Sequence, residues 1–288
     1  MRCIEQSISI GEVEIAIKLW GDEGDRRVLA LHGWLDNAAS FDALIPQLGD
    51  AFQIAAVDLP GHGLSQRRSG VDAYHFIDWV DVVLRITEGL GWEHFSILGH
   101  SMGAAIASLT APVAPRRVER MVFLDGIGPW SEEAENVVDR LRSGLREEAL
   151  LRSRSPRHYA SKQAMVDALA DSRPEVPEQR LRLLADRAAV QSDDGRWRFG
   201  NDDKLKASSR IRLTESQVMQ FLGEIACPVL LVRPRQGWPV DESLIERRLE
   251  AIRNLEVLRV DGGHHVHLEA PERIADDVRR FLGSIDGL

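Results

Sequence analysis

A serine near residue 100 stands in a pattern that suits nucleophilic attack. Residues 99–103 read Gly-His-Ser-Met-Gly, which matches the G-x-S-x-G elbow around Ser101. The apolar run "FSIL" precedes this motif and the small-residue run "AAIASLTA" follows it, as expected for a strand, a tight turn and a helix. Small residues beside the serine let the strand and the helix approach closely. We therefore expect a nucleophile here, and the alternative is a glycine-rich turn with a solvent-facing serine.

Acyl transfer by such a serine needs N–H donors that stabilise the negatively charged oxygen of the transition state. One donor in an elbow is the N–H of the residue after the serine, here Met102. The run "LALHGW" places Trp34 in a loop directly after a buried strand, so its N–H is the candidate for the second donor. The side chain of His32 is expected to hold this loop through hydrogen bonds.

The candidate general base lies near the C-terminus, in the stretch "DGGHHVH". Two glycines after an apolar strand-like run make a loop that brings a histidine toward the serine, where one ring nitrogen takes the proton. His264 directly follows the glycines and is the first candidate, and His265 is the second. A metal site built from His264, His265 and His267 is the rival interpretation. The sequence disfavours it, because no further cluster of Asp, Glu or His completes a convincing zinc set.

Alternating strands and helices must position these residues. Residues 13–20 alternate between apolar and polar types, as in a half-buried strand. Helix-like segments cover 40–48 and 76–91. Short apolar runs typical of buried strands occupy 27–33, 52–63, 95–101 and 120–126. Buried strands that alternate with helices indicate a parallel sheet covered on both faces.

Residues 131–222 interrupt this alternation. They are rich in Arg, Glu, Leu and Ala at helical spacing and contain few strand-like runs. Strand-like runs resume at 227–233 and 255–263, and an amphipathic helix closes the chain. We therefore predict the first part of a core domain over 1–130, a helical cap inserted at 131–222, and the second part of the core over 223–288.

Composition excludes several classes of protein. The 288 residues carry a formal net charge of −9, which argues against a nucleic-acid binder. Cys3 and Cys227 show no metal spacing and no framework of pairs, so we expect two reduced thiols. The N-terminus lacks the apolar run of a signal peptide, and no segment reaches 18 uninterrupted apolar residues. We predict a cytoplasmic protein that binds a small molecule and neither membrane nor nucleic acid, and the oligomeric state stays open.

The motifs together resemble the α/β-hydrolase superfamily. "HGW", "DLPGHGLS", "GHSMG" and "GGHHVHLEAPE" stand in the superfamily's order, and the likeness covers the chain except for 131–222. "LHGWLDNAASFDALIPQL" is especially similar to the group called serine hydrolase-like proteins. The resemblance implies an α/β fold with a mostly parallel eight-stranded sheet, a helical cap inserted after strand 6, and no metal or organic cofactor. It implies no particular substrate, because this fold hosts many chemistries.

The acid that should accompany the histidine is left open. In many members of the superfamily an aspartate follows the strand matched here by "PVLLV", but Gly237 stands at that position. Some members, notably haloalkane dehalogenases, carry the acid at the place matched by Asp125, which ends "MVFLD". Asp125 also keeps the order nucleophile, acid, base along the chain, so it is the first candidate. The alternatives are Asp241, Glu242 and a serine–histidine pair without an acid.

Three further features have a structural and a functional interpretation. "DLPGHGLS" contains Asp58 and His62, and a tight turn with polar groups that satisfy loop amides explains it better than a metal site. His100, next to the serine, is expected to pack and form hydrogen bonds under the elbow. Trp34, Trp130 and Phe41 are candidates for a substrate pocket, since small-molecule sites are mostly apolar, and core packing is the alternative for each.

The sequence thus predicts a serine hydrolase that cleaves a small ester-like substrate through an acyl-enzyme. In this hypothesis Ser101 attacks the carbonyl, His264 transfers the proton and Asp125 orients the histidine, while the N–H groups of Trp34 and Met102 bind the oxyanion. The alternatives are hydrolysis of a carbon–carbon bond or an amide on the same fold, and a non-catalytic ligand-binding homologue.

Overall fold

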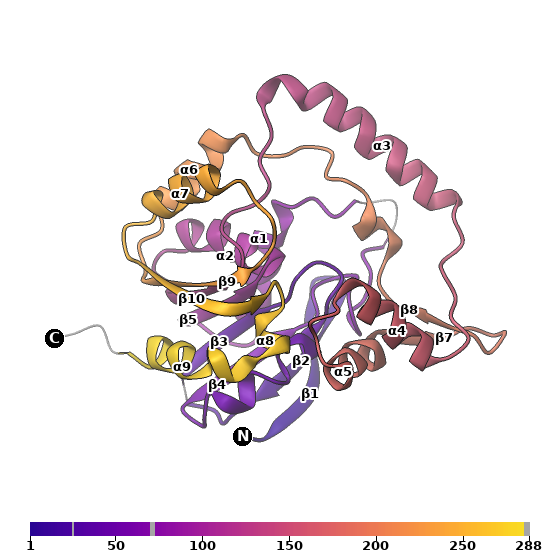
Figure 1. Ribbon diagram of the computed structural model, residues 1–288, viewed down its shortest axis with the longest axis horizontal. Coiled ribbons are helices and arrows are strands. Elements are labelled where there is room, and N and C mark those ends of the chain that lie inside the picture. The colour runs from indigo at the N-terminus through magenta and orange to yellow at the C-terminus, as the bar shows by residue number, and fades with distance from the viewer. Residues whose placement is uncertain (25, 70–72, 285–288) are drawn as a thin grey trace.

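The computed structural model describes residues 1–24, 26–69 and 73–284, and one large sheet dominates it (Figure 1). The sheet has eight strands in the order β1-β2-β4-β3-β5-β6-β9-β10. Strand β2 pairs antiparallel with β1 and with β4, and the other five pairs are parallel. The strands are β1 (Cys3–Ile10), β2 (Val13–Trp20), β3 (Arg26–Leu31), β4 (Phe52–Val57), β5 (Phe95–His100), β6 (Val118–Leu124), β9 (Val229–Gln236) and β10 (Leu255–Gly263). This sheet confirms the predicted fold class.

Each central strand contributes alternate residues to two hydrophobic cores, one on each face of the sheet. In β6, Met121 and Phe123 belong to one core, whereas Val122 and Leu124 belong to the other. Because side chains alternate along a strand, burial on both faces requires an uninterrupted apolar run, which is the pattern seen in the sequence.

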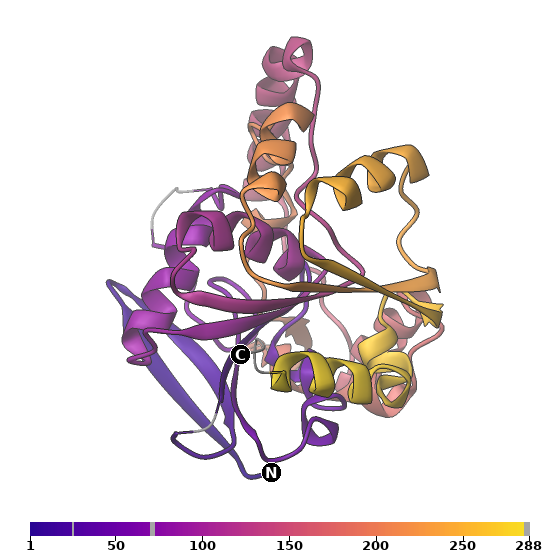
Figure 2. The same ribbon diagram turned by 90° about the vertical axis from the view of Figure 1, so that its left-hand side faces the viewer.

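Helices cover both faces, as Figure 2 shows with the sheet nearly edge-on. One face carries α1 (Asp78–Gly89), α2 (Met102–Val113), α6 (Glu215–Gly223) and α7 (Glu242–Ala251). The opposite face carries α9 (Ala275–Gly283) and the 3₁₀ helices η1 (Ala38–Phe41) and η2 (Ile45–Gln47). The short helix α8 (Val266–Glu269) and the 3₁₀ helix η5 (Pro271–Arg273) lie between β10 and α9. Two layers of helices therefore enclose the sheet.

The region between β6 and β9 contains several helices that do not alternate with strands of the large sheet. It consists of η3 (Ala134–Asn136), α3 (Val137–Ser153), α4 (Lys162–Ser172), α5 (Glu178–Ala188), a hairpin of β7 (Ala189–Gln191) and β8 (Trp197–Phe199), η4 (Asp203–Lys206), and α6. Helices α4 and α5 form a third hydrophobic cluster with Ala39 and Leu268 of the core domain. Helix α3 lies apart from this pair (Figure 1). Helix α6 packs through Val218 and Leu222 into the same core as its neighbour α2, so the last helix of the predicted cap region belongs to the helix layer of the core domain.

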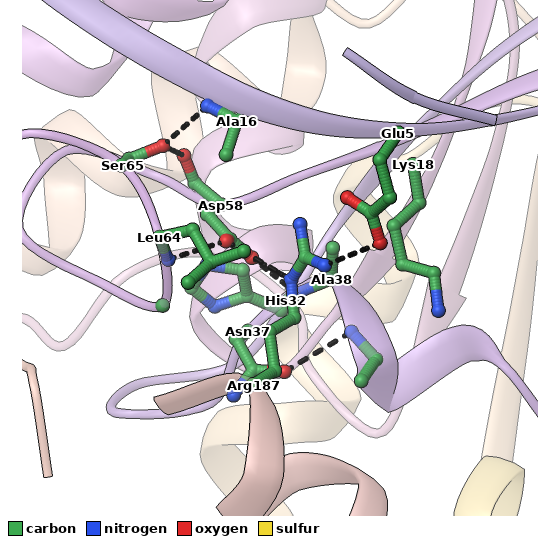
Figure 3. Close-up of polar contacts among 12 residues, drawn as sticks. Glu5, Ala16, Lys18, His32, Asn37, Ala38, Asp58, Leu64, Ser65 and Arg187 are labelled. Carbon is green, nitrogen blue, oxygen red and sulfur yellow. Dashed lines mark hydrogen bonds and ion pairs between the residues drawn. The ribbon is translucent and has the colours of Figure 1, made fainter. Parts of the chain in front are cut away.

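A buried ion cluster joins α5 to the core domain (Figure 3). The Arg187 Nε donates to both carboxylate oxygens of Asp58 at 3.0 Å, and its Nη1 donates to Glu5 at 2.7 Å. Asp58 is fully buried and also accepts from the backbone N–H groups of Ala38 and Leu64, each at 2.7 Å. One carboxylate thus fixes the loops after β3 and β4 and holds a cap helix against them.

Replacing Arg187 by alanine is expected to lower the free energy of unfolding by about 3–5 kcal/mol, because it leaves the buried Asp58 carboxylate without its cation. Urea unfolding followed by circular dichroism measures this change. The matched control is Arg182→Ala in the same helix, where an exposed pair with Glu178 contributes less than about 1 kcal/mol. Equal losses in the two variants would contradict the structural role of the Asp58 cluster.

Candidate active site

Ser101 occupies a strained turn between β5 and α2. Its backbone angles are φ 49° and ψ −110°, a region that residues other than glycine rarely adopt. The flanking glycines make the turn possible. A Cβ at position 99 would lie 2.6 Å from the Ala104 nitrogen, and a Cβ at position 103 would lie 2.0 Å from the Leu31 carbonyl oxygen. The turn therefore requires the G-x-S-x-G pattern and presents the serine at the N-terminus of α2.

The structure brings Ser101, His264 and Asp125 into one chain of hydrogen bonds. His264 follows β10, and its Nε2 lies 3.1 Å from the Ser101 Oγ. Its Nδ1 lies 2.6 Å from the Oδ2 of Asp125, which follows β6. The side chains of His264 and Asp125 are only 13% and 11% exposed, so little water competes for these bonds. A neutral imidazole that donates from Nδ1 to the carboxylate leaves Nε2 free to accept the serine proton.

Gly237, at the position where the superfamily often carries its acid, makes room for Asp125. A Cβ at Gly237 would lie 2.5 and 2.7 Å from the two Asp125 carboxylate oxygens. The next residue, Trp238, donates its backbone N–H to the Asp125 Oδ2 at 2.7 Å. The loop after β9 therefore supplies space and a hydrogen-bond donor to a carboxylate that comes from the neighbouring strand β6.

The alternative acids are engaged elsewhere. Asp241 is the N-cap of α7, and its Oδ1 accepts from the backbone N–H groups of Ser243 at 2.8 Å and Leu244 at 3.3 Å. Hydrogen bonds from Ser243, foremost its hydroxyl, lower the pKa of Asp241. Glu242 forms an ion pair with Arg233 on the surface. Neither carboxylate is hydrogen-bonded to the histidine.

The loop proposed to bind the oxyanion lies directly against the elbow. A Cβ at Gly33 would lie 3.5 Å from the Cβ of Ser101, which places the neighbouring Trp34 backbone beside the serine. The Asp36 N–H donates to the Gly33 carbonyl at 3.1 Å and closes a turn around Trp34. Met102 begins α2, so its N–H has no partner within the helix. The roles of the Trp34 and Met102 N–H groups as oxyanion donors stay predictions.

His32 holds this loop from beneath, as the sequence indicates. It is fully buried, its Nε2 accepts from the Leu59 N–H at 3.1 Å, and its Nδ1 lies 2.7 Å from the Gly33 carbonyl. Burial lowers the pKa of His32, so the ring is neutral at neutral pH.

A model of the family described as the alpha/beta hydrolase fold matches residues 26–271. The chain belongs to this family. It is similar to a serine hydrolase-like protein of Dictyostelium discoideum, with 35% identity over 96% of this chain and 81% of that protein. It is also similar to serine hydrolase-like protein 2 of Homo sapiens, with 30% identity over 96% of this chain and 93% of that protein.

Among solved structures, this α/β-hydrolase resembles the crystal structure of a hypothetical protein from Pseudomonas aeruginosa PAO1. The two are 36% identical with a TM-score of 0.89, over 96% of this chain and 97% of the other. Within the described parts of the chain, no helix is both long and apolar enough to cross a membrane.

Four histidine rings of this α/β-hydrolase form a cluster behind the serine. The His100 ring lies 4.8 Å from His264, 5.2 Å from His265 and 4.2 Å from His267, measured between ring centroids. The His100 Nε2 is 3.0 Å from the His264 carbonyl oxygen, which ties the histidine loop to the elbow. Burial lowers the pKa of His100, His265 and His267, so these rings are neutral at neutral pH.

The cluster is poorly suited to a metal ion. Nitrogens of His100, His264 and His265 lie within 4.8 Å of one another, whereas two nitrogens bound to one tetrahedral zinc ion, each about 2 Å from the metal, lie roughly 3.3 Å apart. Both ring nitrogens of His264 are already hydrogen-bonded, and the Nε2 of His265 accepts from the Arg173 guanidinium at 3.1 Å. The positive charge of Arg173 repels a divalent cation at this position. The hydrogen bonds thus favour proton transfer over metal binding.

Acidification is expected to destabilise the protein steeply. Burial holds the pKa of His62, His100 and His267 well below the ordinary value of 6.5. The unfolded chain therefore binds more protons as the pH falls below about 6.5, and the stability present above that pH is lost. Three such histidines give a slope of up to about 4 kcal/mol per pH unit.

Urea unfolding at several pH values between 5 and 7 measures this slope. His62→Asn is expected to reduce it by about 1.4 kcal/mol per pH unit, whereas the exposed His94→Asn should leave it unchanged. A slope that neither variant alters would contradict the assignment to buried histidines.

Of the three predicted pocket residues, the structure contradicts one and leaves two as predictions. The prediction for Phe41 is wrong, because its side chain has no exposed surface and packs in the core on the α9 face, 5.7 Å from the His267 ring. Trp34 and Trp130 are largely exposed, and their roles in the pocket stay predictions.

Sequence reasoning missed two residues beside the candidate site. Trp238 is 51% exposed, and its ring lies 5.1 Å from His264. The other is Arg173, which contacts His265. The position of Trp238 directly after Gly237 is the only sequence signal that points to it. Trp34 is similarly exposed in the loop after β3, so exposed indole rings are present on both loops that approach the serine.

Proposed function

We propose that this α/β-hydrolase is a serine hydrolase that cleaves a small ester-like substrate through an acyl-enzyme. The observation that supports it best is the position of His264 between the Ser101 Oγ and the Asp125 carboxylate. A nucleophile, a base and an orienting acid in hydrogen-bond contact are the arrangement that acyl transfer requires. Chemistry that begins with a carboxylate nucleophile does not fit, because the elbow position is a serine.

The first half of the proposed reaction forms the acyl-enzyme. The Ser101 Oγ attacks the carbonyl carbon of the ester while its proton moves to the His264 Nε2. The carbonyl oxygen becomes an oxyanion and accepts hydrogen bonds from the Trp34 and Met102 N–H groups. The Asp125 carboxylate stabilises the imidazolium. The intermediate then expels the alcohol, whose oxygen takes the proton from His264.

The second half releases the acid. Water takes the place of the alcohol, gives a proton to the His264 Nε2 and attacks the acyl carbon. The second tetrahedral intermediate expels the Ser101 oxygen, which recovers its proton from the histidine. We further propose that Trp34 and Trp238 contact the apolar part of the substrate, since exposed indole rings beside a reacting centre favour apolar groups.

A panel of p-nitrophenyl esters of different acyl length, combined with intact-mass measurement after acid quench, tests this proposal. We expect turnover of some members and a mass increase equal to the acyl group. Protein that a fluorophosphonate probe labels but that turns over no ester would instead favour an amide or a carbon–carbon bond as the substrate bond. Neither labelling nor turnover would favour a non-catalytic homologue.

A further inference from the structure

An arginine of the cap region bridges the two loops that meet at the serine. Arg173 is the C-cap of α4, and its Nη2 donates to the Oδ1 of Asp36 at 2.6 Å. Its Nε donates to the Nε2 of His265 at 3.1 Å. The Arg173 side chain is 12% exposed and that of Asp36 is 2% exposed, so the bridge is largely shielded from water.

One end of this bridge contacts Asp36 in the turn over residues 33–36, called here the oxyanion turn. Asp36 closes that turn through its own N–H, which donates to the Gly33 carbonyl at 3.1 Å. Its second carboxylate oxygen lies 3.9 Å from the Nδ1 of His100, the residue before the serine. Arg173 is therefore the cation for a buried carboxylate that belongs to the turn carrying Trp34.

The other end contacts His265 in the loop that carries His264, called here the histidine loop. His265 adjoins His264 and is the N-cap of α8, and its carbonyl accepts from the N–H groups of Leu268 and Glu269 in that helix. Its Nδ1 lies 3.3 Å from a Glu175 carboxylate oxygen. With the Nδ1 proton directed to Glu175, the Nε2 lone pair accepts from Arg173. Two residues that follow α4 thus fix the ring next to the proposed base.

We propose that Arg173 is a positioning residue that sets the oxyanion turn and the histidine loop relative to each other, and so couples the placement of the α4–α5 part of the cap to catalysis. This inference rests on the proposed function. A guanidinium suits the task because its planar fork donates in two directions at once, whereas an ammonium is a point charge. A displacement of about 1 Å between donors and base costs roughly 10²-fold in rate, so a small loosening of this bridge is measurable.

Arg180 provides a matched control. It lies in α5 and donates to the backbone carbonyls of Leu268 and Glu269, the latter at 2.8 Å, so it also ties the cap to the core. Within the described residues, Arg180 makes no hydrogen bond or ion pair with Asp36 or His265. A residue that only anchors the cap should behave like Arg180, whereas a positioning residue should affect the chemical step.

The test compares Arg173→Ala, Arg173→Lys and Arg180→Ala for kcat, KM and the rate of fluorophosphonate labelling, with thermal unfolding as the measure of folding. We expect Arg173→Ala to lower kcat and the labelling rate by about 10–100-fold with little change in KM, because the bridge acts on the reacting loops. Millimolar guanidinium should restore part of this loss. Arg180→Ala should stay within about threefold of the parent and should not respond to guanidinium.

The outcomes separate the inference from the function on which it rests. A parent protein that neither labels nor turns over esters removes the proposed function. A labelled parent and an Arg173→Ala variant that labels at the parental rate would overturn the positioning role alone. If the alanine variant does not fold, Arg173→Lys decides the matter, since lysine keeps the charge beside Asp36 but does not span both groups. Parental kcat in a folded lysine variant would overturn the inference.

Discussion

Replacing Ser101 by alanine is expected to lower kcat for a p-nitrophenyl ester by about 10⁶-fold, with KM nearly unchanged. The variant loses the attacking oxygen, and the histidine then has no alcohol from which to take a proton. The substrate still meets the same loops, so its binding in the ground state should persist. Steady-state kinetics at equal protein concentrations measure the change, and circular dichroism verifies that each variant is folded.

Ser172→Ala is the matched control, because this serine lies exposed in α4 and its hydroxyl donates to the Leu169 carbonyl of the same helix. It should retain parental activity. A Ser101→Ala variant that keeps more than about a thousandth of parental turnover would place the nucleophile elsewhere.

Replacing Asp125 by asparagine is expected to lower kcat by about 10⁴-fold. The neutral amide presents N–H groups toward the His264 Nδ1, which favours the tautomer with its proton on Nε2, and that nitrogen then no longer accepts the serine proton. The amide also supports the imidazolium less well than a carboxylate. Kinetics of the folded variant measure the loss.

Asp241→Asn is the control that separates the two candidate acids. Asp241 caps α7 and does not contact the histidine, so this change should alter activity little and stability by at most about 1 kcal/mol. The opposite result, with activity lost in Asp241→Asn and kept in Asp125→Asn, would show that the loop after β9 supplies the acid in solution.

Most of the core sheet could be predicted because its strands are buried on both faces. Strand β4 is apolar or small at five of six positions, and all six are buried. Its uninterrupted apolar run in the sequence therefore corresponds to burial on both faces of the sheet. The elbow could be predicted for a related reason, since Gly99 and Gly103 are required by contacts with their sequence neighbourhood and with β3. Strand β1 is largely exposed and gave no comparable signal.

The details of the site that sequence reasoning missed depend on distant contacts. Phe41 lies in a helix-like segment soon after the "HGW" motif, and only the packing of η1 against the sheet shows that it faces the core. Arg173 is 137 residues from Asp36 and 92 residues from His265, so no local pattern reveals the bridge. From the sequence alone, the arginines of the predicted cap are best explained as the solvent-exposed face of a helix.

Gly237 is needed for the position of the Asp125 carboxylate, although its sequence position first suggests only that an acid is absent. From the sequence alone, its position reads only as the absence of an expected acid. In the structure, the absence of a Cβ there lets the Asp125 carboxylate occupy the space beside His264 and accept the Trp238 N–H. Glycine at this position and aspartate after β6 are therefore two parts of one arrangement.

Peptide mapping by mass spectrometry after treatment with a fluorophosphonate probe tests the central claim most directly. We expect one adduct per chain, located on the peptide that contains Ser101 and formed far more slowly in Asp125→Asn. An adduct on a different serine, or no adduct on folded protein under conditions that label known serine hydrolases, would contradict a nucleophilic Ser101.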